Sequence, residues 1–234
     1  MTVLAHDFAG ETVLVFGGGP VGARKARRFA AEATVVVVAP SFADADFGGA
    51  ERVETAPTPD EVASYVDEHD PALVVAATDD DAVNDAAAAA ARERGALVNR
   101  ADRSGDRDAG SVTVPAALSD GDVTVAVSTG GTSPALSRYL RERVEDELEG
   151  AGAVAAASGD LRERFKSAGV APERRRDAVR AVVRSGAVWR AAREGGADAA
   201  LTAAENVAAE VLDGAVAAPG GDGDHRPPEE GWSP

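Results

Sequence analysis

The stretch that decides the fold runs from Thr12 to Gly22 and reads TVLVFGGGPVG. Its first five residues are apolar or β-branched, which predicts a buried strand. The segment from Val21 to Glu32 has apolar side chains at helical spacing, and Thr34 to Ala39 (TVVVVA) predicts a second buried strand that Pro40 closes. A strand, a tight glycine turn, a helix and a second strand within about 30 residues predict a right-handed βαβ unit.

The glycine turn fits a dinucleotide-binding motif. Gly17, Gly19 and Gly22 match G-x-G-x-x-G, and Gly18 adds room. In this motif the first glycine permits the turn, the second lets the backbone approach the pyrophosphate, and the third allows the helix to pack on the strand. The βαβ context favours binding over the alternative, a glycine-rich turn that binds nothing.

The end of the second strand bears on the choice of cofactor. An acid that holds the ribose usually stands about 20 residues after the turn. This sequence has Ala39, Pro40 and Ser41 there, with no acid before Asp44 and no neighbouring arginine for a 2′-phosphate. We expect Ser41 and backbone groups to hold the ribose, and NAD to be preferred over NADP.

Strands and helices continue to alternate. Strands are predicted at 52–54, 72–77 and 96–99, and helices at 59–66 and from the aspartates after Thr78 to Arg94, with Asp79 or Asp80 as the cap. This order predicts an α/β fold with a Rossmann-type parallel sheet covered on both faces.

The pattern changes after residue 102. A charged loop from Arg103 to Gly110 precedes two predicted strands, 111–118 and 123–128, which form a hairpin. A helix from Pro134 follows, with a stripe at Leu136, Leu140, Val144 and Leu148 that is core or a subunit contact. Helical pattern fills the rest, apart from an acidic tail rich in Gly and Pro. We expect an NAD-binding domain at 1–110, a second region at 111–150, a helical domain at 151–214 and a disordered tail at 215–234.

Composition excludes several classes of function. Forty acids against 24 bases give a net charge of −16, which disfavours nucleic acid and anionic membranes as partners. The chain has no cysteine, no long apolar run and no basic leader, and its three histidines stand at no ligand spacing. We therefore expect a cytoplasmic protein without a bound metal. The acidity resembles that of halophilic proteins, a hypothesis that predicts unfolding in dilute buffer and recovery in high salt.

Three further segments end at the same predicted sheet edge. They are 77–81 with Asn84, 99–102, and 127–134. In a doubly wound sheet the ligand binds beyond the carboxyl ends of the strands. Asp102 is therefore placed for chemistry, although a capping or turn role is the alternative. The segment Gly130 to Pro134 opens a helix with hydroxyls and free amides that suit carboxylates.

Taken in order, these segments resemble the precorrin-2 dehydrogenase/sirohydrochlorin ferrochelatase family, the N-terminal part of siroheme synthase. The resemblance rests on GGGPVGARKA at 17–26, ATDDD at 77–81, Asn99-x-x-Asp102, and STGGTSP at 128–134. It covers about the first 150 residues, and extends loosely to about residue 185. The longer loop after Asp102 and the weakly matching C-terminal helices depart from the pattern.

The resemblance implies a homodimer with a Rossmann domain, a small α+β dimerisation region and a helical C-terminal domain. It implies NAD-dependent oxidation of precorrin-2 to sirohydrochlorin, followed in some members by ferrous iron insertion to siroheme. Asp102 is then the general base. The cofactor-binding residues are expected to be Gly17, Gly18, Gly19, Pro20, Val21, Gly22, Pro40, Ser41 and Thr78. The substrate-binding residues are expected to be Asn99, Ser128, Gly130, Gly131 and Thr132.

Two alternatives remain open. The chain could be a dehydrogenase only, with iron inserted by a separate protein. It could also be a non-catalytic dinucleotide-sensing module, although such modules typically carry an acid at the end of the second strand, which this sequence lacks.

Overall fold

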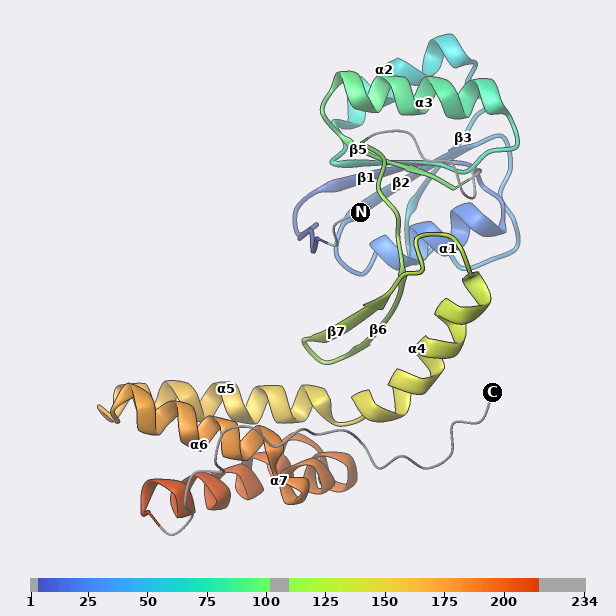
Figure 1. The fold of residues 1–234 in the computed structure, drawn as a ribbon. Helices are drawn as coiled ribbons and strands as arrows, with labels where there is room; N and C mark the ends of the chain where they lie inside the picture. Colours follow the sequence, from blue (N-terminus) through green and yellow to red (C-terminus); the bar gives the residue numbers. More distant parts are fainter. Residues whose placement is uncertain (1–3, 102–109, 215–234) are drawn as a thin grey trace. The chain divides into compact units, whose positions relative to one another are not determined.

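A computed structural model describes residues 4–101 and 110–214, which form two compact units. The first unit contains the chain up to Pro115 together with Ser128–Pro134. Its five-stranded parallel sheet has the order β3-β2-β1-β4-β5 (Figure 1). The strands are β1 (Thr12–Phe16), β2 (Thr34–Ala39), β3 (Glu51–Glu54), β4 (Leu73–Ala76) and β5 (Leu97–Arg100). The helices are α1 (Pro20–Phe29), α2 (Pro59–His69) and α3 (Asp81–Glu93).

Apolar side chains bury both faces of this sheet, as the valine runs predict. Leu14 and Phe16 of β1 point into one core, which α2 and α3 cover. Val13 and Val15 point to the opposite core, which α1 covers (Figure 1). The predicted Rossmann-type parallel sheet is therefore confirmed.

Local signals begin the helices where the sequence indicates. Thr58 and Glu61 form a capping box on α2. Of the two candidate caps of α3, Asp80 serves, since its Oδ1 accepts from the N–H groups of Ala82 at 2.8 Å and Val83 at 3.2 Å. Helix α1 has a glycine at its N-cap and Pro20 at its first position, with no side-chain cap.

The second unit holds the remaining elements. These are β6 (Ala116–Asp120), β7 (Val123–Val127), α4 (Pro134–Leu148, whose first residue clusters with the first unit), α5 (Ala151–Ser167), α6 (Pro172–Arg184) and α7 (Gly186–Leu212). Strands β6 and β7 form an antiparallel hairpin with a turn at Gly121-Asp122. Helices α5, α6 and α7 surround an alanine-rich core, and α7 is interrupted at Gly196, whose φ is 69°.

One predicted strand starts in the wrong place. The segment 111–118 was expected to lie wholly in the hairpin, but β6 begins at Ala116. Residues before it belong to the first unit, where Ser111 forms a parallel bridge with Val98 and the N–H of Val112 donates to Val98 O at 2.7 Å. Pro115 has no N–H for a strand ladder, so it separates the two pairings.

The stripe predicted on α4 is buried only at its end. Leu148 packs with Leu118 and Ala151, whereas Leu136 and Leu140 are 46% and 39% exposed. No helix within residues 4–101 or 110–214 is both long and apolar enough to cross a membrane. The tail expected at 215–234 lies outside the described residues.

Candidate dinucleotide-binding site

Three glycines of the turn after β1 are required by close backbone contacts. A Cβ on Gly17 would lie 2.4 Å from Ala77 O, and one on Gly18 would lie 2.1 Å from Ser41 O. A Cβ on Gly22 would lie 1.9 Å from Gly17 O, across the turn itself. The turn is thus held tightly between the residues that follow β2 and β4, and no other residue type fits at these three positions.

Gly19 has a different role, because a Cβ there would meet no atom within 4 Å. Gly19, Pro20 and Val21 are all exposed at the start of α1. The first N–H groups of a helix have no partner inside it, and the helix dipole adds partial positive charge there. The first turn of α1 contains no acid. This backbone can therefore receive a phosphate group closely, as the motif requires.

The segment after β2 lies directly against the turn. The N–H of Ala43 donates to Gly18 O at 2.8 Å, and the N–H of Gly17 donates to Val38 O at 3.0 Å. Pro40 and Ser41 are exposed beside it. The structure thus brings together the residues expected to contact the pyrophosphate and those expected to contact the ribose.

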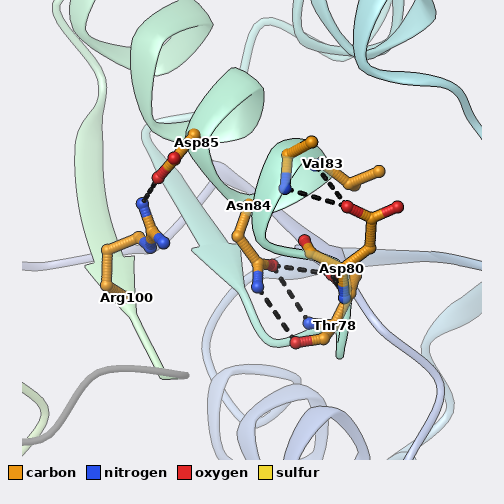
Figure 2. A network of polar contacts seen from close by, with 7 residues as sticks. Thr78, Asp80, Val83, Asn84, Asp85 and Arg100 are labelled. Atoms are coloured by element: carbon orange, nitrogen blue, oxygen red, sulfur yellow. Dashed lines mark hydrogen bonds and ion pairs between the residues drawn. The ribbon is translucent and has the colours of Figure 1, made fainter.

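The segment after β4 is fixed by a buried asparagine (Figure 2). Asn84 is fully buried, and its Oδ1 accepts from the N–H of Thr78 at 3.1 Å and lies 2.9 Å from Thr78 Oγ1. Asn84 Nδ2 donates to Thr78 O at 3.0 Å. The hydroxyl of Thr78, expected to bind cofactor, is thus engaged within the protein. Thr78 thereby fixes the backbone of this segment, in which the carbonyl group of the preceding residue, Ala77, packs against Gly17.

Strand β5 presents Asn99 and Arg100 to opposite faces of the sheet. Arg100 pairs with Asp85 of α3, with Nη1 and Oδ1 2.5 Å apart (Figure 2). Asn99 is 5% exposed, and its Nδ2 donates to Val112 O at 2.8 Å. Its Oδ1 is buried without a hydrogen-bond partner within the described residues. A buried acceptor without a donor is costly, which makes Asn99 a candidate contact for a ligand N–H or O–H.

The proposed base, Asp102, lies outside the described residues. The residue before it, Ala101, is described, and its N–H donates to Ala76 O at 2.8 Å. The chain therefore still follows the sheet when it reaches the position preceding Asp102.

The glycine loop before α4 is held by its own side chains. Thr132 Oγ1 donates to Thr129 O at 2.5 Å, and the N–H of Gly130 donates to Ser128 Oγ at 3.2 Å. Gly130 and Gly131 have φ values of 67° and 91°, which favour glycine. The loop belongs to the same compact unit as the parallel sheet.

Helix α1 carries four bases, Arg24, Lys25, Arg27 and Arg28. Arg28 Nη1 donates to Pro115 O at 2.7 Å. Burial, then repulsion from Arg28 and Arg24, lowers the pKa of Lys25 to about 8. Lys25 makes no ion pair within the part of the chain that is described. An anion bound beside this amine would stabilise its charged form.

Sequence reasoning did not find the partner of Asn99 or the position of Arg28. Val112 and Pro115 come near these residues because the segment from Ser111 pairs with β5, and no local sequence pattern predicts that pairing. Asn84 carries a weak signal, since it stands four residues after Asp80 at the start of an alanine-rich helix.

Fold and turn together define a Rossmann-type protein with an NAD(P)-binding domain. Residues 4–116 match the family described as putative NAD(P)-binding, and residues 120–147 match the sirohaem biosynthesis protein central family.

Two curated relatives and one solved structure are also similar to the chain. It is 32% identical over 148 residues to precorrin-2 dehydrogenase of Methanosarcina barkeri, covering 61% of this chain and 64% of the relative. It is 36% identical over 165 residues to siroheme synthase 1 of Aeromonas salmonicida, covering 67% of this chain and 33% of the relative. The solved structure of SirC, a precorrin-2 dehydrogenase, shares the fold with a TM-score of 0.64 and 21% identity, over 91% of this chain and all of that one.

The chain belongs to the precorrin-2 dehydrogenase/sirohaem synthase N-terminal family, in which an NAD-binding domain is combined with a central domain. The resemblance inferred from the four motifs is thereby confirmed. The chain spans just under two thirds of its precorrin-2 dehydrogenase relative and a third of the siroheme synthase.

Proposed function

We propose that the chain is a cytoplasmic precorrin-2 dehydrogenase of siroheme biosynthesis, which oxidises precorrin-2 to sirohydrochlorin with NAD. The observation that carries this proposal is the glycine turn clamped between the ends of β2 and β4, in a chain that belongs to this family. The relative from Methanosarcina barkeri, named precorrin-2 dehydrogenase, supports the choice of reaction.

The residues of the turn fit the dinucleotide. The open backbone at Gly19, Pro20 and Val21 would hold the pyrophosphate, while Gly17, Gly18 and Gly22 keep the turn compact. Pro40 and Ser41 would line the adenosine ribose. Thr78, fixed by Asn84, would support the cofactor through the backbone that it positions. Bound NAD supplies the acceptor for the hydride that leaves the macrocycle.

Asp102 would receive the proton that leaves with the hydride. Oxidation of a carbon–carbon or carbon–nitrogen bond removes one hydride and one proton, so a base within hydrogen-bond reach of that proton is required. No histidine stands near this position in the sequence, and Asp102 is the second residue after the end of β5 at Arg100.

The substrate would be held by its carboxylates and by polar groups of the macrocycle. The amides and hydroxyls of Ser128, Gly130, Gly131 and Thr132 suit carboxylates. The Oδ1 of Asn99, which has no partner among the described residues, suits an N–H donor. Ferrous iron insertion to give siroheme is a second candidate activity of this site, favoured by the relatives named siroheme synthase.

Incubation with precorrin-2 and NAD, followed by absorbance of the macrocycle with and without ferrous iron, tests the function. Conversion to sirohydrochlorin without iron uptake is expected of a dehydrogenase alone. Appearance of the iron complex would add the chelatase activity. NAD binding without any change in precorrin-2 would refute the enzyme and favour a dinucleotide-sensing module.

We further propose that the chain is a homodimer that associates through α4. Leu136, Tyr139 and Leu140 of this helix are 46%, 55% and 39% exposed. Contiguous exposed apolar side chains mark association surfaces. Light scattering should give twice the mass of one chain, and Leu140→Glu should give the mass of a single chain with NAD binding retained. A wild-type monomer at micromolar concentration would refute the dimer.

A further inference from the structure

The loop after β2 contains an aromatic residue beside the phosphate-binding turn. In a Rossmann domain the adenosine ribose lies at the end of the second strand, about 20 residues after the glycines. Here Phe42 occupies that place, and its Cδ1 lies 3.1 Å from the position of a Cβ on Gly18. The hydrogen bond from Ala43 to Gly18 fixes the loop against the turn. Phe42 therefore lies at the ribose end of the proposed site.

Arg52 of β3 stacks on this aromatic residue. Its guanidinium carbon lies 5.5 Å from the ring centroid of Phe42 and 5.9 Å from that of Phe47. The two rings contact edge to face with centroids 5.6 Å apart, and Phe47 is 5% exposed. A guanidinium held over aromatic faces keeps N–H groups at its edge for hydrogen bonding, and this stacking reduces its freedom in advance of binding.

The guanidinium of Arg52 pairs with no carboxylate of the described residues. The side chain is exposed and makes no ion pair or hydrogen bond within residues 4–101 and 110–214. In contrast, Arg94 and Arg164 pair with Asp67 and Asp160. A stacked arginine with free donors is the side chain that recognises phosphate by two parallel hydrogen bonds.

We infer that Arg52 binds the 2′-phosphate of NADP, so that this domain accepts NADP as well as NAD. The inference rests on the proposed dinucleotide site and adds its specificity. The absence of an acid between Ala39 and Phe42 supports it, because an acid at that place would repel a 2′-phosphate. Arg52 pairs with Val37, two residues before the end of β2, and its guanidinium reaches the ribose end of the proposed site through its contact with Phe42.

Calorimetric binding of NAD, NADP and 2′,5′-ADP to the full chain tests this specificity. The wild type should bind NADP with a Kd within about tenfold of that for NAD. Arg52→Met keeps a long apolar side chain against the two rings. It should lower the affinity for NADP and for 2′,5′-ADP by at least about tenfold, because one charge-assisted contact is lost. Its affinity for NAD should change less than about twofold on the same basis.

A matched control is Arg94→Met, which removes the same charge from an exposed arginine at the C-cap of α3 and should leave both affinities unchanged. If Arg52→Met lowers the affinities for NAD and NADP equally, the inference is overturned, since Arg52 then contributes only by packing against the rings. NAD binding in the wild type with NADP more than a hundredfold weaker would also overturn it. If neither dinucleotide binds the wild type, the proposed function itself fails.

Discussion

The unit with the parallel sheet and the unit with α5, α6 and α7 bury different kinds of side chain. Most of the largest fully buried side chains within the described residues, among them Phe16, Leu14 and Leu73, belong to the strands of the sheet, and the others belong to α2 of the same unit. In the helical core, Ala178, Ala200 and other alanines are almost completely buried. Alanine removes little apolar surface from water, so this core gains less stability per buried residue than the valine-rich sheet.

The two units also differ in how much of their function can be inferred from their sequence. Buried strands need continuous β-branched runs, and a phosphate-binding turn needs glycines at fixed positions, so the first unit has a specific sequence pattern. An alanine-rich bundle can be made from many sequences. The family matches accordingly end at residue 147, whereas structural similarity to SirC continues over 91% of the chain.

The largest expected effect is chemical and belongs to the sheet-bearing unit. Asp102→Asn should lower single-turnover oxidation of precorrin-2 by about a thousandfold, because the amide cannot accept a proton. NAD affinity, measured by calorimetry, should stay unchanged. Asp79→Asn, an exposed acid after β4, serves as the control and should retain full turnover. Turnover of Asp102→Asn within tenfold of the wild type would exclude its role as base.

Two helical glycines, one in each unit, should respond in opposite directions to alanine. Gly22→Ala in α1 places a Cβ 1.9 Å from Gly17 O and should cost about 3 kcal/mol in the free energy of unfolding, because backbone must move. Gly159→Ala in α5 meets no atom within 4 Å and should add about 0.5–1 kcal/mol. Denaturant titration measures both, and NAD affinity should fall only for the first. A neutral Gly22→Ala would show that the turn is not clamped.

The alanine-rich core should depend on its few larger side chains. Leu161, 3% exposed in α5, contacts this core, and Leu161→Ala should lower the free energy of unfolding by about 2–3 kcal/mol. Affinity for NAD should not change, because the proposed dinucleotide-binding residues belong to the other unit. Loss of NAD binding at a temperature where the variant is folded would show that the two units are coupled.

The smallest effect concerns the half-buried amine of α1. The pKa of Lys25 is lowered to about 8, so the charged form is disfavoured in the folded protein. Lys25→Met should therefore raise the free energy of unfolding by about 1 kcal/mol at pH 7, less than the full shift implies because water screens the amine.

This gain has a defined dependence on pH. Above pH 8 the folded wild type loses the proton of Lys25 while the unfolded chain keeps it up to its ordinary pKa of 10.5. The wild type then becomes more stable relative to Lys25→Met as pH rises from 8 to 10.5. Unfolding of both proteins at pH 7, 9 and 10.5 measures the difference, and a constant difference would contradict the lowered pKa.

Much of the first unit follows from local pattern. The runs TVLVF and TVVVVA predict β1 and β2 within their observed bounds, and Asp80 caps α3 as one of two candidates. The end of α3 near Arg94 and the hairpin turn at Gly121 also follow from local sequence. A glycine follows Arg94, and a glycine and an aspartate form the turn. The first residue of β6 was predicted wrongly because Ser111 and Val112 pair with β5, which belongs to the other unit.

By itself, the sequence determined the strands, the order of the alternating elements and the glycines of the phosphate-binding turn, because each depends on neighbours within a few residues. Tertiary structure alone decided that Ser41 and Ala77 close on Gly18 and Gly17, that the buried Oδ1 of Asn99 has no partner among the described residues, and that Arg52 lies over the ring of Phe42. These contacts join segments of the chain that belong to, or follow, different strands of the sheet. Their formation depends on strand order and register, which the pairing of the whole sheet sets and no single segment encodes.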